Sequence, residues 1–135
     1  MKQVKRNFTR QLAFAIAFLL ILLLKGVAYS QQCLPQGIHL TTQADIDNFS
    51  VNYPGCTVIE GDVCIGGCTL QDTSDITNLN GLSQITSIHG RLHIINNPLL
   101  TTLDGLVLTS FHDDVFIESN ALLISLAAFQ QIERI

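Results

Sequence analysis

Charge and length set the first limits on this chain of 135 residues. Five of its seven Lys and Arg residues lie in the first thirty positions, whereas all eleven Asp and Glu residues lie beyond them. The remaining 105 residues therefore hold two Arg, no Lys and eleven acidic residues, which gives a formal charge of −9. Phosphate groups are bound by clusters of Lys and Arg, so neither nucleic acid nor anionic lipid is an expected partner. A chain of this length forms one domain with a modest core.

A secretory leader is predicted over residues 1–30. Four basic side chains in the first ten positions precede an uninterrupted apolar run over residues 12–24, as in signal peptides. The run is shorter than the roughly 20 residues that cross a bilayer, and the small residues Ala28 and Ser30 suit cleavage before Gln31. An uncleaved membrane anchor is the weaker alternative. We therefore expect a secreted or cell-surface product with no membrane insertion after leader cleavage.

A small N-terminal cap is predicted over residues 31–55. Thr42 followed three residues later by Asp45 is a helix-start pattern, and Ile46 and Phe49 give the helix one apolar side. The Asn-Tyr-Pro-Gly sequence that closes the segment ends the helix and turns the chain into the first strand. Such a cap would keep water from the apolar interior of the first repeat.

Asn48 begins an Asn-Phe-Ser sequence, which is an acceptor for N-linked glycosylation. In a eukaryotic secretory pathway this sequence predicts a glycan on a surface loop. In a bacterium it has little meaning, and the sequence does not declare its source.

Four cysteines, Cys33, Cys56, Cys64 and Cys68, lie beyond the leader. An oxidising compartment favours disulfides, and four cysteines allow three pairings. We favour a bond between Cys33 and Cys56, because it would join the cap to the first repeat and contribute on the order of 3 kcal/mol. Cys64 and Cys68 can form a second bond, or Cys68 can stay a buried thiol. Irregular spacing argues against a zinc site made by all four.

A short phrase recurs three times within residues 56–135. Each copy has two apolar residues separated by one position, then Asn or Cys, then Leu, and the copies begin at Val63, Leu92 and Val115. The apolar side chains of each strand would point inward, while the Asn or Cys bonds backbone groups where the chain turns. One copy cannot bury its own apolar face, so neighbouring copies must stack. The fold class predicted is mostly β: a short parallel β-solenoid of leucine-rich-repeat type with a small N-terminal helical cap.

The repeat extends beyond this phrase. Segment 79–88 returns as 126–135 with its apolar residues at identical spacing, and a copy that begins at Leu103 is one residue shorter. The resulting steps of 24 and 23 residues fall within the leucine-rich-repeat range. Ile135 aligns with Ile88, which stands just before a strand. We therefore expect an incomplete final copy and more repeats or domains in a longer chain. A frayed end on a short product is the alternative.

Two sequence segments resemble the receptor L domain. They are Gly-Cys-Thr-Val-Ile-Glu-Gly-Asp-Val at 55–63 and Ile-Thr-Asn-Leu-Asn-Gly-Leu at 76–82. That family forms the ligand-binding modules of insulin-receptor and EGF-receptor ectodomains, and similar repeats occur in secreted bacterial surface proteins. The resemblance covers about residues 33–135 and implies an extracellular ligand-binding module. The chain departs from the pattern at Asp113, where earlier copies have Gly, and at Cys68, where later copies have Asn.

Stacked strands place equivalent residues in columns about 4.8 Å apart on the exposed face. Asp62, Arg91 and Asp114 would form an acid, base, acid column whose opposite charges support the register. Three further columns are expected: Glu60, His89 and His112; Cys64, His93 and Phe116; Gly66, Ile95 and Glu118. Aromatic and Arg side chains dominate interface energetics. We therefore predict a ligand-binding face, with an ordinary solvated sheet as the alternative, and its residues are Arg91, His93, Ile95, Asp114, Phe116 and Glu118.

The sequence contains no convincing catalytic or metal-binding pattern. The sequence contains no Gly-x-Ser-x-Gly elbow, no phosphate-binding Gly loop and no His-Glu-x-x-His helix. His89 and His93 would lie roughly 13 Å apart along a strand, too far for one metal ion. His89, His112 and Glu60 are better placed for zinc but are more typical of solvated contacts, and the paired aspartates lack a complete calcium cage. We expect no enzyme activity, no cofactor and no metal.

The predicted function is extracellular or cell-surface binding or adhesion, with the stacked-strand face presented to a protein or glycan ligand. One alternative is a fragment of a polysaccharide-acting enzyme on a parallel β-helix. That enzyme would need basic residues to hold acidic sugars, and two Arg are too few. A non-binding structural spacer is the other alternative.

The leader and the cysteines are tested together by the intact mass of the endogenous secreted product. We expect the chain to begin at Gln31 and its mass to rise on reduction, because disulfides gain hydrogen. Mass spectrometry with and without reductant measures both. A mass that retains the leader, or one that reduction leaves unchanged, would contradict these predictions.

Overall fold

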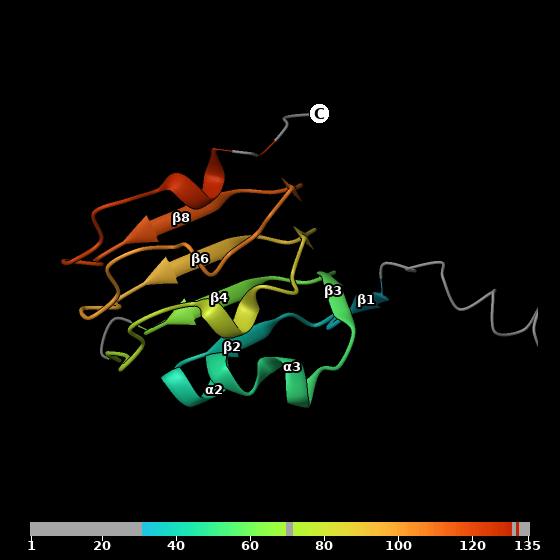
Figure 1. Ribbon diagram of the computed structural model, residues 1–135, viewed down its shortest axis with the longest axis horizontal. Coiled ribbons are helices and arrows are strands. Elements are labelled where there is room, and N and C mark those ends of the chain that lie inside the picture. The colour runs from blue at the N-terminus through green and yellow to red at the C-terminus, as the bar shows by residue number, and fades with distance from the viewer. Residues whose placement is uncertain (1–30, 70–71, 131, 133–135) are drawn as a thin grey trace, which may run out of the picture.

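The computed structural model describes residues 31–69, 72–130 and 132 (Figure 1). The predicted leader lies outside the described residues, as do Leu70 of the first sequence phrase and Ile135 at the end of the predicted repeat. The described chain is mostly strand, with a few short helices. Within it, no helix combines the length and the apolar character needed to span a bilayer.

The strands of the described residues form two parallel sheets of four strands each. The first sheet has the order β1 (Gln31–Cys33), β3 (Cys56–Ile59), β5 (Ser87–Ile88), β7 (Ser110–Phe111). The second sheet has the order β2 (Ile38–Leu40), β4 (Val63–Gly66), β6 (Leu92–Ile95), β8 (Val115–Glu118). The chain alternates between the two sheets, so sequence order becomes spatial order, and Figure 1 shows β2, β4, β6 and β8 in succession toward the C-terminus.

The sequence phrase places three strands correctly, because β4, β6 and β8 begin at Val63, Leu92 and Val115. Two strands occur where only a helical segment was expected: β1, and β2 at Ile38–Leu40, which pairs with β4. Only three residues of β2 precede the turn into the helix, so the Asn and Leu that mark later strands have no counterpart there. The two-residue strands β5 and β7 were also missed, because two residues show no periodicity.

Two short helices follow β2, where the sequence predicts one, and the first begins at the predicted position. α2 (Gln43–Asp47) has Thr42 as its N-cap, and α3 (Phe49–Asn52) follows directly. The Thr42 side chain accepts the Asp45 N–H at 3.1 Å, and the Asp45 carboxylate accepts the Thr42 N–H at 2.9 Å. This reciprocal capping satisfies backbone donors that the first helical turn leaves without partners. Ile46 of α2 and Phe49 of α3 are fully buried, so the two predicted apolar residues reach the core from separate helices rather than from one side of a single helix.

Among the described residues, a single apolar cluster joins the helices, the strands other than β7 and the 3₁₀ turns η2 (Asn80–Leu82) and η3 (Ala127–Phe129). In β6 the side chains alternate, with Leu92 and Ile94 buried and His93 and Ile95 half-buried. Successive side chains of a strand point to opposite faces, so this alternation separates a core face from an outer face. The fully buried members include Ile59, Ile65, Ile76, Leu79, Leu82, Ile85, Ile88, Leu100 and Leu103.

The Asn97 amide connects three successive turns beside the second sheet. Asn97 is fully buried, its Nδ2 donates to the Ile65 carbonyl at 3.1 Å and to Asn120 Oδ1 at 3.0 Å, and its Oδ1 accepts the Ser74 hydroxyl at 2.6 Å. Asn120 Nδ2 donates in turn to the Ile94 carbonyl at 2.7 Å. These contacts confirm the expectation that the Asn of the phrase bonds backbone groups where the chain turns.

Gly66 lies directly beneath this amide with a φ of +102°. A Cβ at this position would collide with the Ile95 carbonyl oxygen and with both polar atoms of the Asn97 side chain. Glycine is therefore required here both for its backbone conformation and for the space that the amide occupies.

Asn97→Ala should destabilise the protein by about 2–4 kcal/mol, because it leaves a buried carbonyl and a buried hydroxyl without their partners. Urea unfolding followed by circular dichroism measures this free energy. The matched control is Asn80→Ala, which removes an exposed amide from η2 and should change the unfolding free energy by less than about 0.5 kcal/mol. Equal effects of the two substitutions would show that the amide network does not hold the turns.

The capping contacts of Asp45 give folding stability a pH dependence. Burial acts to raise the pKa of this carboxyl, but hydrogen bonds with Thr42 and Thr41 outweigh it and hold the pKa below its ordinary value. A carboxylate with a lowered folded-state pKa contributes stability above its unfolded pKa of about 3.9 and loses it as pH falls through the folded-state value.

Asp45→Asn should therefore lower the melting temperature by about 2–4 °C at pH 7. The difference from the unsubstituted protein should shrink below about pH 4, where the native carboxylate also becomes protonated. Thermal unfolding at a series of pH values measures this difference. A difference that stays constant from pH 7 to pH 3 would contradict the assignment to the carboxylate charge.

Candidate binding surface

The outer face is the surface formed by the outward-pointing side chains of β2, β4, β6 and β8 and by the residues just before those strands. Strand register sets its layout: Cys64 lies opposite His93 and His93 opposite Phe116, while Gly66 lies opposite Ile95 and Ile95 opposite Glu118. The register agrees with these two expected columns. It also adds His39 of β2 beside Cys64, a residue that the sequence analysis missed because β2 was not expected.

Charged residues precede three of the strands, and their pairing is uneven. Arg91 Nη2 lies 3.3 Å from Asp62 Oδ2, and the Arg91 backbone N–H donates to Asp62 Oδ1 at 2.8 Å. Both side chains are about half exposed, so the ion pair contributes at most about 1 kcal/mol. Asp114, the third member of the predicted column, forms no ion pair with any described residue. The sequence predicts contacts of Arg91 with both Asp62 and Asp114, and among the described residues the structure forms the contact with Asp62.

Aromatic rings stack across β6 and β8. The His93 and Phe116 ring centroids lie 4.9 Å apart, with 16° between the ring planes. Phe116 is 37% exposed, a large value for an aromatic side chain held in place by a neighbour. Ile95, which is half-buried, lies diagonally from Phe116 across the same two strands. The two rings and Ile95 form an apolar strip on an otherwise polar face.

Both predicted cysteine pairs lie at disulfide distance in the structure. The Cys33–Cys56 bond joins β1 to β3 within the first sheet, with a Cα separation of 5.7 Å. The Cys64–Cys68 bond spans 6.2 Å between Cα atoms and lies on the outer face. It forms part of a shallow hollow of about 200 Å³, lined also by His39, Asp62, His93 and Ile95. Two such bonds are compatible with an extracellular protein.

The histidines beside the acid–base pair form a smaller cluster. His89 Nδ1 lies 3.3 Å from Glu60 Oε1, and the His89 and His112 rings meet edge to face at 4.5 Å. These are the cross-strand contacts expected of the column that contains Glu60. Within the described part of the chain, no group of three or more His, Cys, Asp or Glu side chains has a geometry that could hold a metal ion.

Asn48 lies between the two helices, where it is the C-cap of α2 and the residue before α3. It is exposed, and its Nδ2 donates to the Ala44 carbonyl at 2.9 Å. A glycan on this nitrogen would be accessible, and it would leave one N–H of the amide for the bond to Ala44.

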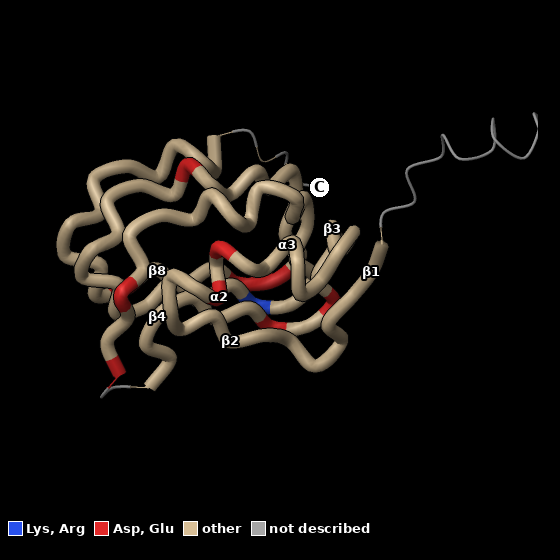
Figure 2. Tube along the Cα trace, turned by 60° about the horizontal axis from the view of Figure 1, so that its bottom comes forward, with Lys and Arg blue, Asp and Glu red and all other residues tan. Residues whose placement is uncertain are grey.

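Charge is distributed unequally over the described residues, as Figure 2 shows. Arg91 is the one Lys or Arg among them, whereas ten of the eleven acidic residues are described, Glu133 being outside. The described residues therefore carry a formal charge of −9, and their one cation is already paired with Asp62.

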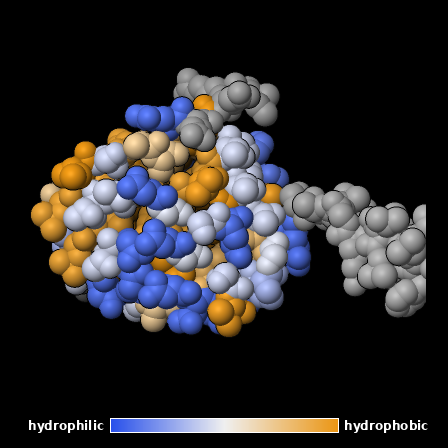
Figure 3. Space-filling view, in the orientation of Figure 1, coloured by the Kyte–Doolittle hydropathy of each residue, from blue (hydrophilic) through white to orange (hydrophobic). Residues whose placement is uncertain are grey.

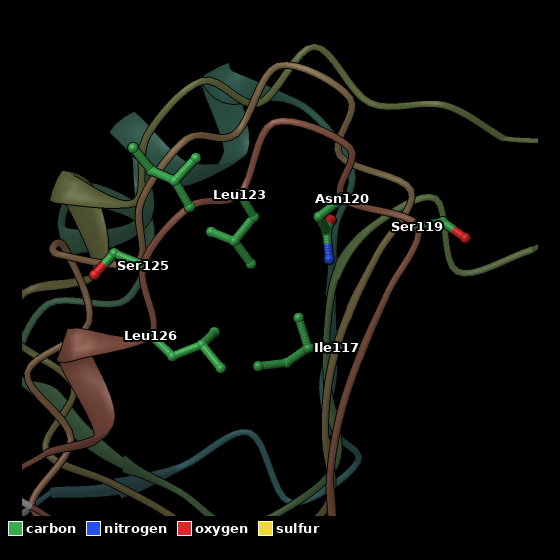
Figure 4. Close-up of a pocket in the computed structure, with 7 residues that line it drawn as sticks. Ile117, Ser119, Asn120, Leu123, Ser125 and Leu126 are labelled. Carbon is green, nitrogen blue, oxygen red and sulfur yellow. The ribbon is translucent and has the colours of Figure 1, made fainter.

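A second surface lies at the end of the structure that follows β8. Figure 4 shows the side chains of Ile117, Leu123 and Leu126 pointing into a common hollow of about 380 Å³. Leu126 is 53% exposed there, although the residues at its matching positions, Leu103 and Leu79, are buried. We call the surface formed by Ile117, Leu123, Ile124 and Leu126 the apolar end.

Other apolar side chains reach the surface beyond the strands. Figure 3 shows hydrophobic atoms along the side of the molecule toward which the arrows of β4, β6 and β8 point in Figure 1. Leu99 and Leu122, which follow β6 and β8 by four residues, are each about half exposed. The Leu that closes the sequence phrase is therefore not a core residue in these two copies.

No family model, curated protein or solved structure matches this chain. The resemblance to the receptor L domain therefore stays a prediction from the sequence segments that carry it. Among the described surfaces, the outer face is the one where aromatic, apolar and charged side chains lie together. All six residues predicted to contact a ligand are on or beside its strands: Arg91, His93, Ile95, Asp114, Phe116 and Glu118.

Proposed function

We propose that this protein is an extracellular or cell-surface binding module that presents its outer face to a protein or glycan ligand. One observation carries the proposal: the stacked, partly exposed His93 and Phe116 rings lie between the Asp62–Arg91 pair and the apolar Ile95 side chain. Aromatic and Arg anchors surrounded by polar side chains are typical of the centres of binding interfaces. The strands beneath hold these groups in register, so little order has to be gained on binding.

The fold behind this face is, in our proposal, a short parallel β-solenoid of the leucine-rich-repeat or receptor-L-domain type. Two features support it. The chain alternates regularly between two parallel sheets, and side chains at matching sequence positions, such as Leu79 and Leu103, are buried alike. Extended, repeated faces of this kind are used for recognition far more than for chemistry.

The helices α2 and α3 would then act as the N-terminal cap. Both pack against η2, and Ile46 and Phe49 reach the apolar cluster from this side. Their outward residues are mostly exposed and polar, except for Ala44 and Val51. A polar outer layer over an apolar inner one is what the terminal unit of a stacked fold needs for solubility.

The apolar end would serve a different purpose, which is to pack against further repeats or a further domain. Ile117 matches Ile94, and Leu126 matches Leu103; the earlier member of each pair is fully buried by the strand or turn that follows it. The end of the described structure thus repeats an internal packing surface. Large exposed apolar side chains in one place mark an interaction site in soluble proteins.

The binding function is tested with the purified secreted protein on an array of immobilised glycans and extracellular protein domains. We expect at least one ligand whose affinity falls about fivefold or more in both Phe116→Ala and Arg91→Ala, because each removes an anchor worth at least about 1 kcal/mol. The control is Val51→Ala, which truncates an exposed apolar side chain on α3 and should leave affinity unchanged. A structural spacer would give no ligand, or ligands that both outer-face variants bind as well as the unsubstituted protein does.

A further inference from the structure

We propose that the ligand of the outer face is a basic, extended segment of a partner protein. The segment carries Lys or Arg at two positions four residues apart with an apolar residue midway, and it lies along β8. This inference rests on the proposed binding function and narrows its ligand from a protein or a glycan to one chemical class.

The spacing comes from the side chains of β8 and the residue before it. Asp114, Phe116 and Glu118 occupy alternate positions, whereas Val115 and Ile117 between them pack against the apolar cluster. Alternate residues of a strand point to the same side and lie roughly 6.5 Å apart. The exposed Phe116 ring is therefore flanked along the strand by two carboxylates, Asp114 two residues before it and Glu118 two residues after it.

Neither flanking carboxylate is neutralised by a described residue. The Arg91 side chain, which the register brings next to Asp114, bonds Asp62 instead. Glu118 lies opposite Ile95, which has no charge to offer. Asp113 adds a third carboxylate beside the same strand, and it accepts the Asp114 backbone N–H at 2.8 Å rather than a cation. β8 thus carries a local excess of negative charge next to its ring.

Long basic side chains suit this arrangement because they are both apolar and charged. The methylene stem of Lys or Arg can lie over Phe116 and Ile95 while its charged head reaches Asp114 or Glu118. An aromatic ring attracts the same cations electrostatically. The apolar residue midway between the two cations would rest on the strip formed by His93, Phe116 and Ile95.

Charge also argues against other occupants. The described residues carry a formal charge of −9, so sulfated or uronic-acid glycans would be repelled. A second copy of the chain would bring the same charge and would place carboxylates opposite carboxylates if two β8 strands paired antiparallel about Phe116. A neutral glycan could stack on Phe116 and donate hydroxyl hydrogen bonds to the two carboxylates, but it would leave their negative charge uncompensated, whereas a basic segment would neutralise it.

The test uses the full secreted protein and a fluorescein-labelled peptide with the central sequence Lys-Ser-Leu-Ser-Lys between glycine pairs. Fluorescence anisotropy measures the dissociation constant of this peptide and that of a second peptide in which both Lys are replaced by Glu. A competition experiment then tests whether a neutral cello-oligosaccharide displaces the Lys peptide. We expect the Lys peptide to bind at least about tenfold more tightly than the Glu peptide and the preference to weaken as salt is raised.

Substitutions then locate the site. The double variant Asp114→Asn with Glu118→Gln should weaken Lys-peptide binding about tenfold, the product of two exposed ion pairs of about threefold each. The matched control, Asp47→Asn with Asp104→Asn, removes the same net charge from α2 and from the turn between β6 and β7, both outside the outer face, and should change binding by less than about twofold. Circular dichroism confirms that both double variants remain folded.

Equal weakening by the two double variants would overturn the proposal, because it would show attraction to overall charge rather than to this strand. Equal binding of the Lys and Glu peptides, or displacement of the Lys peptide by the neutral oligosaccharide, would overturn it as well. Any of these three results would still leave the proposed binding function intact if the array yields a neutral or acidic ligand whose affinity falls in Phe116→Ala. An array with no ligand would overturn both.

Discussion

The buried Asn97 amide is the contact on which the rest of this structure depends. It bonds the Ile65 carbonyl of the strand before it and the Asn120 side chain of the turn after it, and thereby fixes how far β4, β6 and β8 advance past one another. Side chains of a strand alternate between faces, so a slip of one residue would bring Phe116 and Glu118 into the core and Ile117 out to water. One amide thus protects both the apolar interior and the outer face. Gly66 makes room for it, which explains why a residue without a side chain follows Ile65.

Once the register is fixed, the outer face is determined by neighbours rather than by sequence distance. His93 and Phe116 are 23 positions apart, yet their rings stack because β6 and β8 are adjacent. The same adjacency places Arg91 between Asp62 and Asp114, and the Arg91 side chain pairs with Asp62, which precedes β4. Its backbone N–H is already held by Asp62, so the side chain and the main chain of Arg91 share one carboxylate. Because of that shared contact, Asp114 on the other side forms no ion pair with any described residue.

Much of this could be predicted from the sequence, because the phrase that begins at Val63, Leu92 and Val115 carries both the strand alternation and the turn-forming Asn. The phrase fixes the columns, and Thr42 with Asp45 marks the helix start. Strand β2 could not be found this way, since three residues followed by a helix lack the rest of the phrase. The choice of Asp62 over Asp114 by Arg91 was equally hidden, because both lie at the correct spacing and the backbone contact decides between them. Ring orientation and the hollow beside the Cys64–Cys68 bond depend on three-dimensional packing alone.

The apolar end and the outer face place different physical demands on whatever covers them. The apolar end repeats an internal packing surface, so its partner must match it in shape, and burial of Leu126 and Ile117 would supply a non-directional driving force. The outer face has only a narrow apolar strip, so a partner there would also need positive charge to complement the carboxylates beside Phe116. A sheet that served only as a spacer would gain stability from a Lys or Arg at one of these positions, as Arg91 gives beside Asp62. The strand instead places its ring between two carboxylates that form no ion pair with any described residue, so a partner that supplied positive charge here would add contacts that the described residues do not make.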